Sequence, residues 1–129
     1  MNFVVLDTNA FLRFLLNDVP SQADEVVKLF TKARSKETEV FIPQIVLFEI
    51  EFALDKYYKL TKDQVIKKLE SLLVTPYLKV QDKGVFQDAL QLFSTQNLDF
   101  VDCFIECMAQ NRSASLFTFD KNLQKLTKG

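Results

Sequence analysis

Two kinds of apolar pattern alternate along the chain. Short apolar runs bounded by turn residues predict strands buried in a parallel sheet. Longer stretches, in which apolar residues recur every three or four positions, predict amphipathic helices. The predicted strands are Phe3–Leu6, Glu39–Ile42, Tyr77–Val80 and Ala114–Phe119. The predicted helices are Thr8–Leu16, Ser21–Lys36, Gln44–Lys59, Thr61–Leu73, Asp82–Gln96, Asp99–Ala109 and Asn122–Lys128, with Ser21, Thr61 and Asp99 as N-caps.

Strands that alternate with helices in this way predict a parallel sheet with helices on both faces. We therefore expect an α/β fold, a three-layer α/β/α sandwich with a short central parallel sheet. The length of 129 residues suits one domain with a substantial core, and neither an internal repeat nor a long linker divides the chain. Residues 1–129 are thus predicted to form a single domain.

The composition limits the chemistry that the chain can perform. It has 48% hydrophobic and 26% charged residues, typical of a soluble globular protein, and a formal net charge of −1. That net charge provides no general attraction for nucleic acid, so such binding would require a local patch. Because the chain has no histidine, catalytic triads, general bases and metal sites that use histidine are excluded.

The two cysteines, Cys103 and Cys107, lie four positions apart in an apolar helical pattern. Without further cysteine or histidine ligands they cannot form a zinc site, and we expect small core or surface residues in a reducing cytosol. The sequence has neither a signal peptide nor an apolar run long enough to cross a membrane. The predicted location is therefore the cytoplasm.

Four acidic residues stand out by their positions in the predicted elements. Asp7 and Asp120 each follow a strand, at the edge where ligands bind in open α/β sheets. Asp102 lies in the first turn of the helix that precedes the last strand. Glu49 lies inside the most apolar helix, where an unpaired buried charge is costly. The ordinary alternatives for Glu49 are a pairing with Lys56 or exposure to water.

The aspartates also have an ordinary structural interpretation. An aspartate after a strand often caps the next helix, which would account for Asp7 and Asp120. Asp99 and Asp102 resemble a capping pair at the start of one helix. Taken together, however, the acids form a set of oxygen ligands without nitrogen or sulfur, which favours Mg²⁺ or Mn²⁺ over zinc. A cation held by few carboxylates keeps positions open for phosphate oxygens of a substrate.

The acids occur within four segments that span the chain from end to end: Val5–Asn9, Ile42–Glu49, Leu98–Ile105 and Leu116–Asp120. In order and spacing these segments resemble the motifs of PIN-domain ribonucleases, in particular the small VapC-type toxins of bacterial and archaeal toxin–antitoxin systems. The chain departs from the family pattern beside Asp102, where Val101 and Cys103 replace small residues. The departure removes no acid.

The resemblance implies a function and a set of catalytic residues. It implies a Mg²⁺- or Mn²⁺-dependent endoribonuclease whose catalytic and metal-binding acids are Asp7, Glu49, Asp102 and Asp120. The first three would hold a cation, and Asp120 would help to place a second ion or the attacking water.

The resemblance also assigns supporting residues. Asn9 and Thr118 match family positions that organise the acids by hydrogen bonding, and Thr8 lies beside them. Asp99 matches a frequent acidic position near Asp102, where we expect it to support that ligand or to cap the helix. Arg13, on the helix that begins at the active-site edge, is a candidate contact for a phosphate, although an exposed helix arginine is the ordinary alternative.

The expected partners are RNA, single-stranded or looped, and a cognate antitoxin protein. The helices predicted over residues 8–16 and 44–59 have more apolar surface than one small sheet requires. This excess predicts a homodimer and an apolar groove that an antitoxin covers. No membrane partner is expected.

Four other functions compete with the nuclease interpretation. A catalytically inactive PIN-fold interaction or RNA-binding module would keep the acids only as caps or remnants, and retention of all four argues against it. A haloacid-dehalogenase-like phosphatase requires Asp-x-Asp at the first strand, but position 9 is Asn9. A response-regulator receiver requires paired acids there, and Asp7 has no acidic neighbour. A flap-type DNA nuclease requires added helical regions for which 129 residues leave no room.

Overall fold

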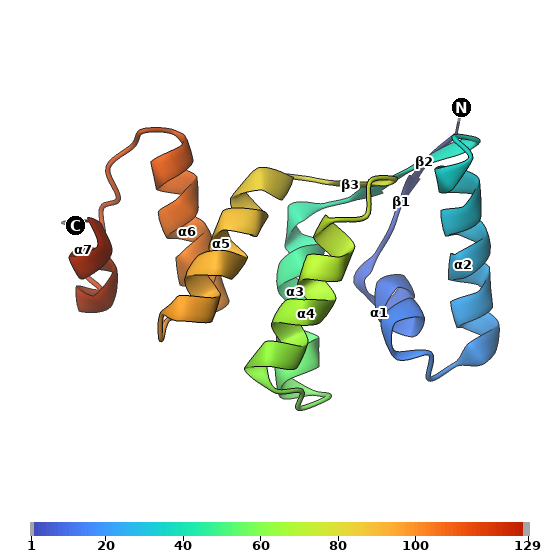
Figure 1. The fold of residues 1–129 in the computed structure, drawn as a ribbon, viewed down its shortest axis with the longest axis horizontal. Coiled ribbons are helices and arrows are strands. Elements are labelled where there is room, and N and C mark those ends of the chain that lie inside the picture. The colour runs from blue at the N-terminus through green and yellow to red at the C-terminus, as the bar shows by residue number, and fades with distance from the viewer. Residues whose placement is uncertain (1, 128–129) are drawn as a thin grey trace. The chain divides into compact units, whose positions relative to one another are not determined.

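The computed structural model describes residues 2–127 and consists of two compact units that divide between Gln81 and Asp82 (Figure 1). The first unit contains β1 (Asn2–Val5), α1 (Thr8–Leu16), α2 (Pro20–Arg34), β2 (Thr38–Ile42), α3 (Gln44–Lys56), α4 (Lys62–Leu73) and β3 (Leu78–Val80). The second unit contains α5 (Lys83–Thr95), α6 (Phe100–Asn111) and α7 (Lys121–Thr127). The predicted α/β class is confirmed.

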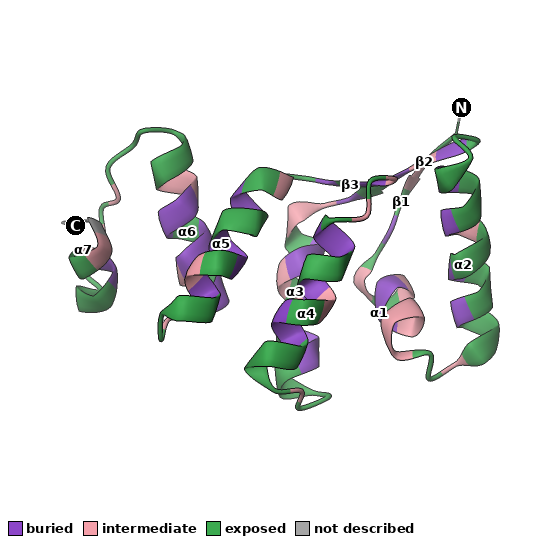
Figure 2. Ribbon diagram, viewed as in Figure 1, coloured by how far each residue is buried: buried purple, intermediate pink, exposed green. Residues whose placement is uncertain are grey.

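The sheet of the first unit has the strand order β1-β2-β3, and all its strands run parallel. Val4 pairs with Val40, which pairs in turn with Leu78, so these residues lie on the same face. Helices α2 and α4 contact this part of the sheet, and β2 and β3 both contain buried positions (Figure 2). Val40 and Ile42 are fully buried. The core of the first unit therefore lies between one face of the sheet and its helices.

The opposite face of this sheet has apolar side chains that remain exposed. Phe3 and Val5 are 75% and 66% exposed, and Phe41 beside them on β2 is exposed as well. The prediction that Phe3–Leu6 is buried on both faces is therefore wrong for this structure. Successive side chains of a strand point to opposite faces, so only one side of β1 meets the helices of its own unit.

Side-chain caps mark the starts of α1 and α4, whereas α2, α3, α5 and α6 begin without a side-chain capping hydrogen bond among the described residues. Thr61 caps α4 as predicted, and it forms a capping box in which Gln64 returns a hydrogen bond to the Thr61 N–H. Helix α2 begins at Pro20 rather than after Ser21, because proline suits a first helical turn whose N–H groups have no partner in the helix. None of the helices within residues 2–127 is long and apolar enough to cross a membrane.

Aromatic packing between α5 and α6 forms the core of the second unit. Phe86 is fully buried, with its ring centroid 4.6 Å from that of Phe104 and 6.0 Å from that of Phe100. Phe93 packs against Phe100 at 5.6 Å. Cys103 and Cys107 are buried and form no disulfide bond, as expected for two residues on the apolar face of α6.

The strand predicted over Ala114–Phe119 is absent from the structure. Residues 114–120 have no regular secondary structure, and none of the elements described after Gln81 is a strand. A strand requires a neighbouring strand as the hydrogen-bond partner of its backbone, and the second unit offers none. The apolar alternation that motivated the prediction is present, since Phe117 and Phe119 have their rings 5.4 Å apart, but both remain exposed.

Candidate active site

Asp7 lies at the carboxyl end of β1, where the chain leaves the sheet and enters α1. The strand pairing extends to the residue before it, because the Leu6 N–H donates a hydrogen bond to the Phe41 carbonyl oxygen at 2.9 Å. Asp7 is the N-cap of α1, and its Oδ1 accepts a hydrogen bond from the Ala10 N–H at 2.9 Å. The cap uses one carboxylate oxygen and leaves the other for a further ligand, so capping and catalysis do not exclude one another.

Glu49 lies exposed on α3 and is hydrogen-bonded to the start of α1. The Thr8 hydroxyl donates to Glu49 Oε1 at 2.6 Å. Because Thr8 directly follows Asp7, this bond brings Glu49 to the segment that contains Asp7. Lys56, the alternative partner of Glu49, has its Nζ 3.5 Å from Asp55 Oδ2 instead. Local sequence does not indicate the Thr8–Glu49 bond, since its partners are 41 residues apart.

Asp99 and Asp102 lie at the start of α6 in the second unit. Asp99 occupies the N-cap position, as predicted, but its side chain makes no capping hydrogen bond among the described residues. Asp102 lies in the first turn and is half-buried. Burial raises the pKa of Asp102 above its ordinary value, and the negative charges of Asp99 and Asp120 raise it further. The three carboxylates of this unit are therefore near enough to repel one another.

Asp120 precedes α7 and is held by two local hydrogen bonds. Its Oδ1 accepts from the Leu123 N–H at 3.0 Å, and its own N–H donates to Thr118 Oγ1 at 3.0 Å. The Thr118 carbonyl oxygen accepts from Gln124 Nε2 at 2.8 Å. Thr118 thus positions the backbone of Asp120 rather than its carboxylate. Asp120 resembles Asp7 in that a helix cap uses one carboxylate oxygen.

Arg13 and Asn9 lie on α1 near these acids in the sequence. Arg13 forms an ion pair with Asp18 just beyond the same helix, with Nη1 and Oδ2 2.7 Å apart. A solvent-accessible pair of this kind contributes only about 0.2–1 kcal/mol, so exchange of Asp18 for a phosphate would have a small energetic cost. Asn9 is exposed, and its side chain forms no hydrogen bond to an acid within residues 2–127.

Comparison with known proteins places this arrangement in a family. A family model for the PIN domain matches residues 4–129, which include every acid discussed above. The chain belongs to the PIN domain family. A VapC ribonuclease of Aquifex aeolicus (strain VF5) is 24% identical to it over 123 residues, which is 95% of this chain and 90% of that protein. The resemblance inferred from the sequence motifs is thereby confirmed, and the match runs across both compact units.

The acids of this PIN domain fit a hard divalent cation in their donor chemistry. They offer only oxygen ligands, which is the preference of Mg²⁺ and Mn²⁺. Asp7 and Asp120 each use one oxygen in a helix cap, and Glu49 uses one in its bond to Thr8, so each carboxylate retains a second oxygen. No group of three Asp, Glu or Cys side chains within residues 2–127 is arranged to hold a metal ion.

Replacing Asp102 by asparagine should stabilise the metal-free PIN domain. A raised pKa means that the folded state favours the protonated carboxyl, so the stability contribution of Asp102 falls as the pH rises above the unfolded value of 3.8. Asparagine is neutral at every pH and relieves the repulsion from Asp99 and Asp120. We expect the melting temperature at pH 7, measured in EDTA, to rise by roughly 2–4 °C per kcal/mol gained.

Asp24→Asn is the matched control, because Asp24 is exposed on α2 and undergoes the same chemical change. Its melting temperature should stay close to that of the parent protein, as for most surface substitutions. A lower melting temperature for Asp102→Asn would contradict the repulsion among the three carboxylates.

Proposed function

We propose that this PIN domain is a metal-dependent endoribonuclease that cleaves single-stranded or looped RNA and is the toxin of a toxin–antitoxin pair. The observation on which this rests is the family match over residues 4–129, which contains all four acids in order. The similarity to a protein named VapC ribonuclease supports both the RNA substrate and the role as a toxin. The agreement in length, 95% of one chain and 90% of the other, supports one PIN domain over the whole chain.

In this proposal Asp7, Glu49, Asp102 and Asp120 hold Mg²⁺ or Mn²⁺. When bound, the cation supplies an activated water and neutralises charge on the phosphate that is attacked. Hydrogen bonds within the chain hold the ligand carboxylates in place. The Thr8 hydroxyl orients Glu49, and the two helix caps restrict the carboxylates of Asp7 and Asp120.

The charges of the second unit also support a role in cation binding. Asp102 has its pKa raised by burial and by two neighbouring carboxylates, so its ionised form lacks a compensating positive charge. A divalent cation would supply that charge. Repulsion of this kind is a cost to folding that a purely structural capping group would not require, and it is typical of acids retained for binding.

The proposed partners are an antitoxin and a second copy of this chain. Apolar side chains remain exposed on and just after α3, among them Ile45, Phe52 and Tyr57. Exposed aromatic and aliphatic residues in one region are typical of protein interfaces. We place the protein in the cytoplasm, where an RNA substrate and an antitoxin would both be available.

Removal of divalent cations tests the proposal directly. Purified protein should cut a structured RNA with exposed loops in buffer containing Mg²⁺ or Mn²⁺. EDTA should abolish the cleavage, because without the cation nothing lowers the pKa of the attacking water or neutralises charge on the phosphate. Products are measured on a denaturing gel, and an excess of Mg²⁺ added after EDTA should restore them. Undiminished cleavage in EDTA would contradict a metal-dependent mechanism. The absence of cleavage with either cation would favour the inactive PIN-fold module.

A further inference from the structure

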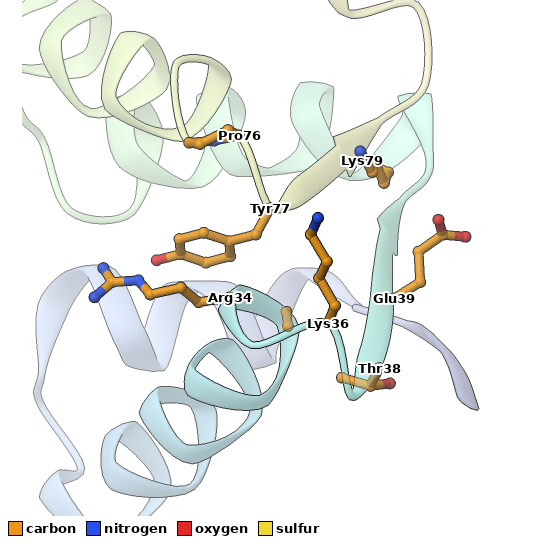
Figure 3. Close-up of a pocket in the computed structure, with 8 residues that line it drawn as sticks. Arg34, Lys36, Thr38, Glu39, Pro76, Tyr77 and Lys79 are labelled. Atoms are coloured by element: carbon orange, nitrogen blue, oxygen red, sulfur yellow. The ribbon is translucent and has the colours of Figure 1, made fainter. Parts of the chain in front are cut away.

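A pocket of about 390 Å³ lies in the first unit, at the edge of the sheet where β2 and β3 begin (Figure 3). Asp7 follows the carboxyl end of β1, so this pocket and Asp7 lie at opposite edges of a parallel sheet. The pocket takes residues from the end of α2, the start of β2 and the start of β3. Its volume lies within the range of about 300–1,000 Å³ that is usual for small-molecule sites.

Positive charge predominates in the lining of this pocket. Arg34, Lys36 and Lys79 contribute three cations, whereas Glu39 contributes one carboxylate. Lys36 extends into the space between Tyr77 and Glu39 (Figure 3). Neither Lys36 nor Lys79 forms an ion pair within the described part of the chain. The pocket thus has more cations than carboxylates, and the two lysines form no ion pair there, which is suited to an anionic ligand.

An aromatic ring lies beside these cations. The guanidinium carbon of Arg34 is 5.5 Å from the ring centroid of Tyr77, and Phe30 supports the same ring with its centroid 6.1 Å away. Planar guanidinium and aromatic groups are the surfaces on which nucleic-acid bases stack. The pocket therefore combines a cationic part with a flat aromatic part.

The backbone conformation at Lys36 favours glycine over lysine. Lys36 has φ 66°, in the left-handed region, and directly follows Ser35, the C-cap of α2. Its N–H donates to the Ala33 carbonyl, and the Glu37 N–H donates to the Lys32 carbonyl, which together form the helix-ending motif that usually contains glycine. Backbone preference thus does not explain the lysine, but Lys59 outside the pocket has the same left-handed backbone, so the proposal rests on the lining of the pocket and not on this conformation.

The helix dipole explains part of the positive charge at this pocket. Cations near a helix C-terminus interact favourably with the helix dipole, which would account for Arg34 and Lys36 at the end of α2. It does not account for Lys79, which lies on β3, or for the position of Tyr77 against Arg34. The helix dipole therefore explains only part of the positive charge at this pocket.

We propose that this pocket binds a nucleotide, with the phosphate at Lys36 and Lys79 and the base against the Tyr77–Arg34 pair. The ligand is either a free nucleotide or a nucleotide within RNA. Both combine a phosphate with a flat aromatic base. The proposal does not depend on nuclease activity, because none of the lining residues belongs to the acid set. Failure of one proposal therefore leaves the other intact.

The test measures binding of AMP, UMP and a short oligoribonucleotide by isothermal titration calorimetry in EDTA. Lys36→Gly should weaken binding about tenfold or more, since a charge-assisted contact to phosphate contributes about 1.5–3 kcal/mol and tenfold corresponds to about 1.4 kcal/mol. Because glycine suits φ 66°, the melting temperature should not fall, which separates loss of binding from loss of fold. If mononucleotides bind, the source is a free nucleotide; if only the oligoribonucleotide binds, it is RNA.

Lys59→Gly is the matched control. Lys59 also has a left-handed backbone, with φ 54°, and is exposed outside the pocket, so the change removes the same charge and relieves the same strain. We expect its affinity to stay within about twofold of the parent value. Equal weakening by both variants would overturn the proposal in favour of general charge attraction. Binding of inorganic phosphate as tight as that of AMP, or no binding of any nucleotide, would overturn it as well.

Asp7→Asn separates this pocket from the acid site. The substitution should leave nucleotide affinity unchanged in EDTA, because Asp7 lies at the other edge of the sheet. If Asp7→Asn abolished nucleotide binding while Lys36→Gly did not, the nucleotide would occupy the acid site, and the assignment to the pocket would be overturned.

Discussion

Replacing Asp7 by asparagine should lower RNA cleavage about 100-fold or more while the protein stays folded. Cation catalysis contributes several kcal/mol to transition-state stabilisation, and each 1.36 kcal/mol is a factor of ten in rate. Asparagine keeps the shape of the side chain and still caps a helix well, so the hydrogen bond from the Ala10 N–H to Oδ1 should persist. The measurement is the initial rate of RNA cleavage in Mg²⁺, with circular dichroism as the check on folding.

Asp24→Asn is again the control, because it makes the same chemical change on an exposed helix. Its cleavage rate should equal that of the parent protein. Full activity of Asp7→Asn in a preparation free of other nucleases would show that Asp7 acts only as a helix cap. Because the capping bond is retained in asparagine, the experiment distinguishes the cap that the structure shows from the ligand role that we propose for the same carboxylate.

The helices of this protein were largely predictable because their signals are local. Thr61 and Gln64 form the predicted N-terminus of α4 within four residues of each other. The start of α2 was misplaced because both Pro20 and Ser21 are plausible first-turn residues, and proline took the first helical position. Helix boundaries depend on which of several acceptable caps is used, and propensity alone does not decide between them.

The strands were less predictable because each depends on a partner elsewhere in the chain. Apolar alternation in Ala114–Phe119 matches a strand, yet the second unit offers no strand to pair with it. For β1, the composition of Phe3–Leu6 indicated burial on both faces, whereas Phe3 and Val5 are exposed. Local sequence indicates that a segment is suited to a sheet, and only tertiary structure determines which of its faces are covered.

The candidate site shows the same division between local and distant information. Asp7 was recognisable as a possible cap and as a possible ligand, and its capping bond is to a residue three positions away. The Thr8–Glu49 bond joins two helices, and Lys36 and Lys79 line one pocket from different elements, so no spacing rule indicates either arrangement. The family motif identified the acids, but it contained no information on the pocket at the opposite edge of the sheet.

Truncation of Phe86 to alanine should cause the largest loss of stability among the substitutions considered. Phe86 is fully buried and packs on both Phe100 and Phe104 across the α5–α6 pair. Removal of a buried phenylalanine side chain costs about 3–5 kcal/mol, a large part of the roughly 5–15 kcal/mol that stabilises a typical domain. Urea unfolding followed by far-ultraviolet circular dichroism measures the loss, since the chain has no tryptophan to report by fluorescence.

Tyr57→Ala provides the matched aromatic control, because Tyr57 is 74% exposed and contacts Phe52 edge to face at 5.8 Å. The free energy of unfolding of Tyr57→Ala should fall by less than about 1.5 kcal/mol. If both variants lost little stability, the aromatic residues of α5 and α6 would not form a packed core. A single transition that shifts as a whole in Phe86→Ala would mean that the two units unfold together. Because Asp102 lies on α6 with Phe100 and Phe104, loss of this core should then lower RNA cleavage in parallel with stability.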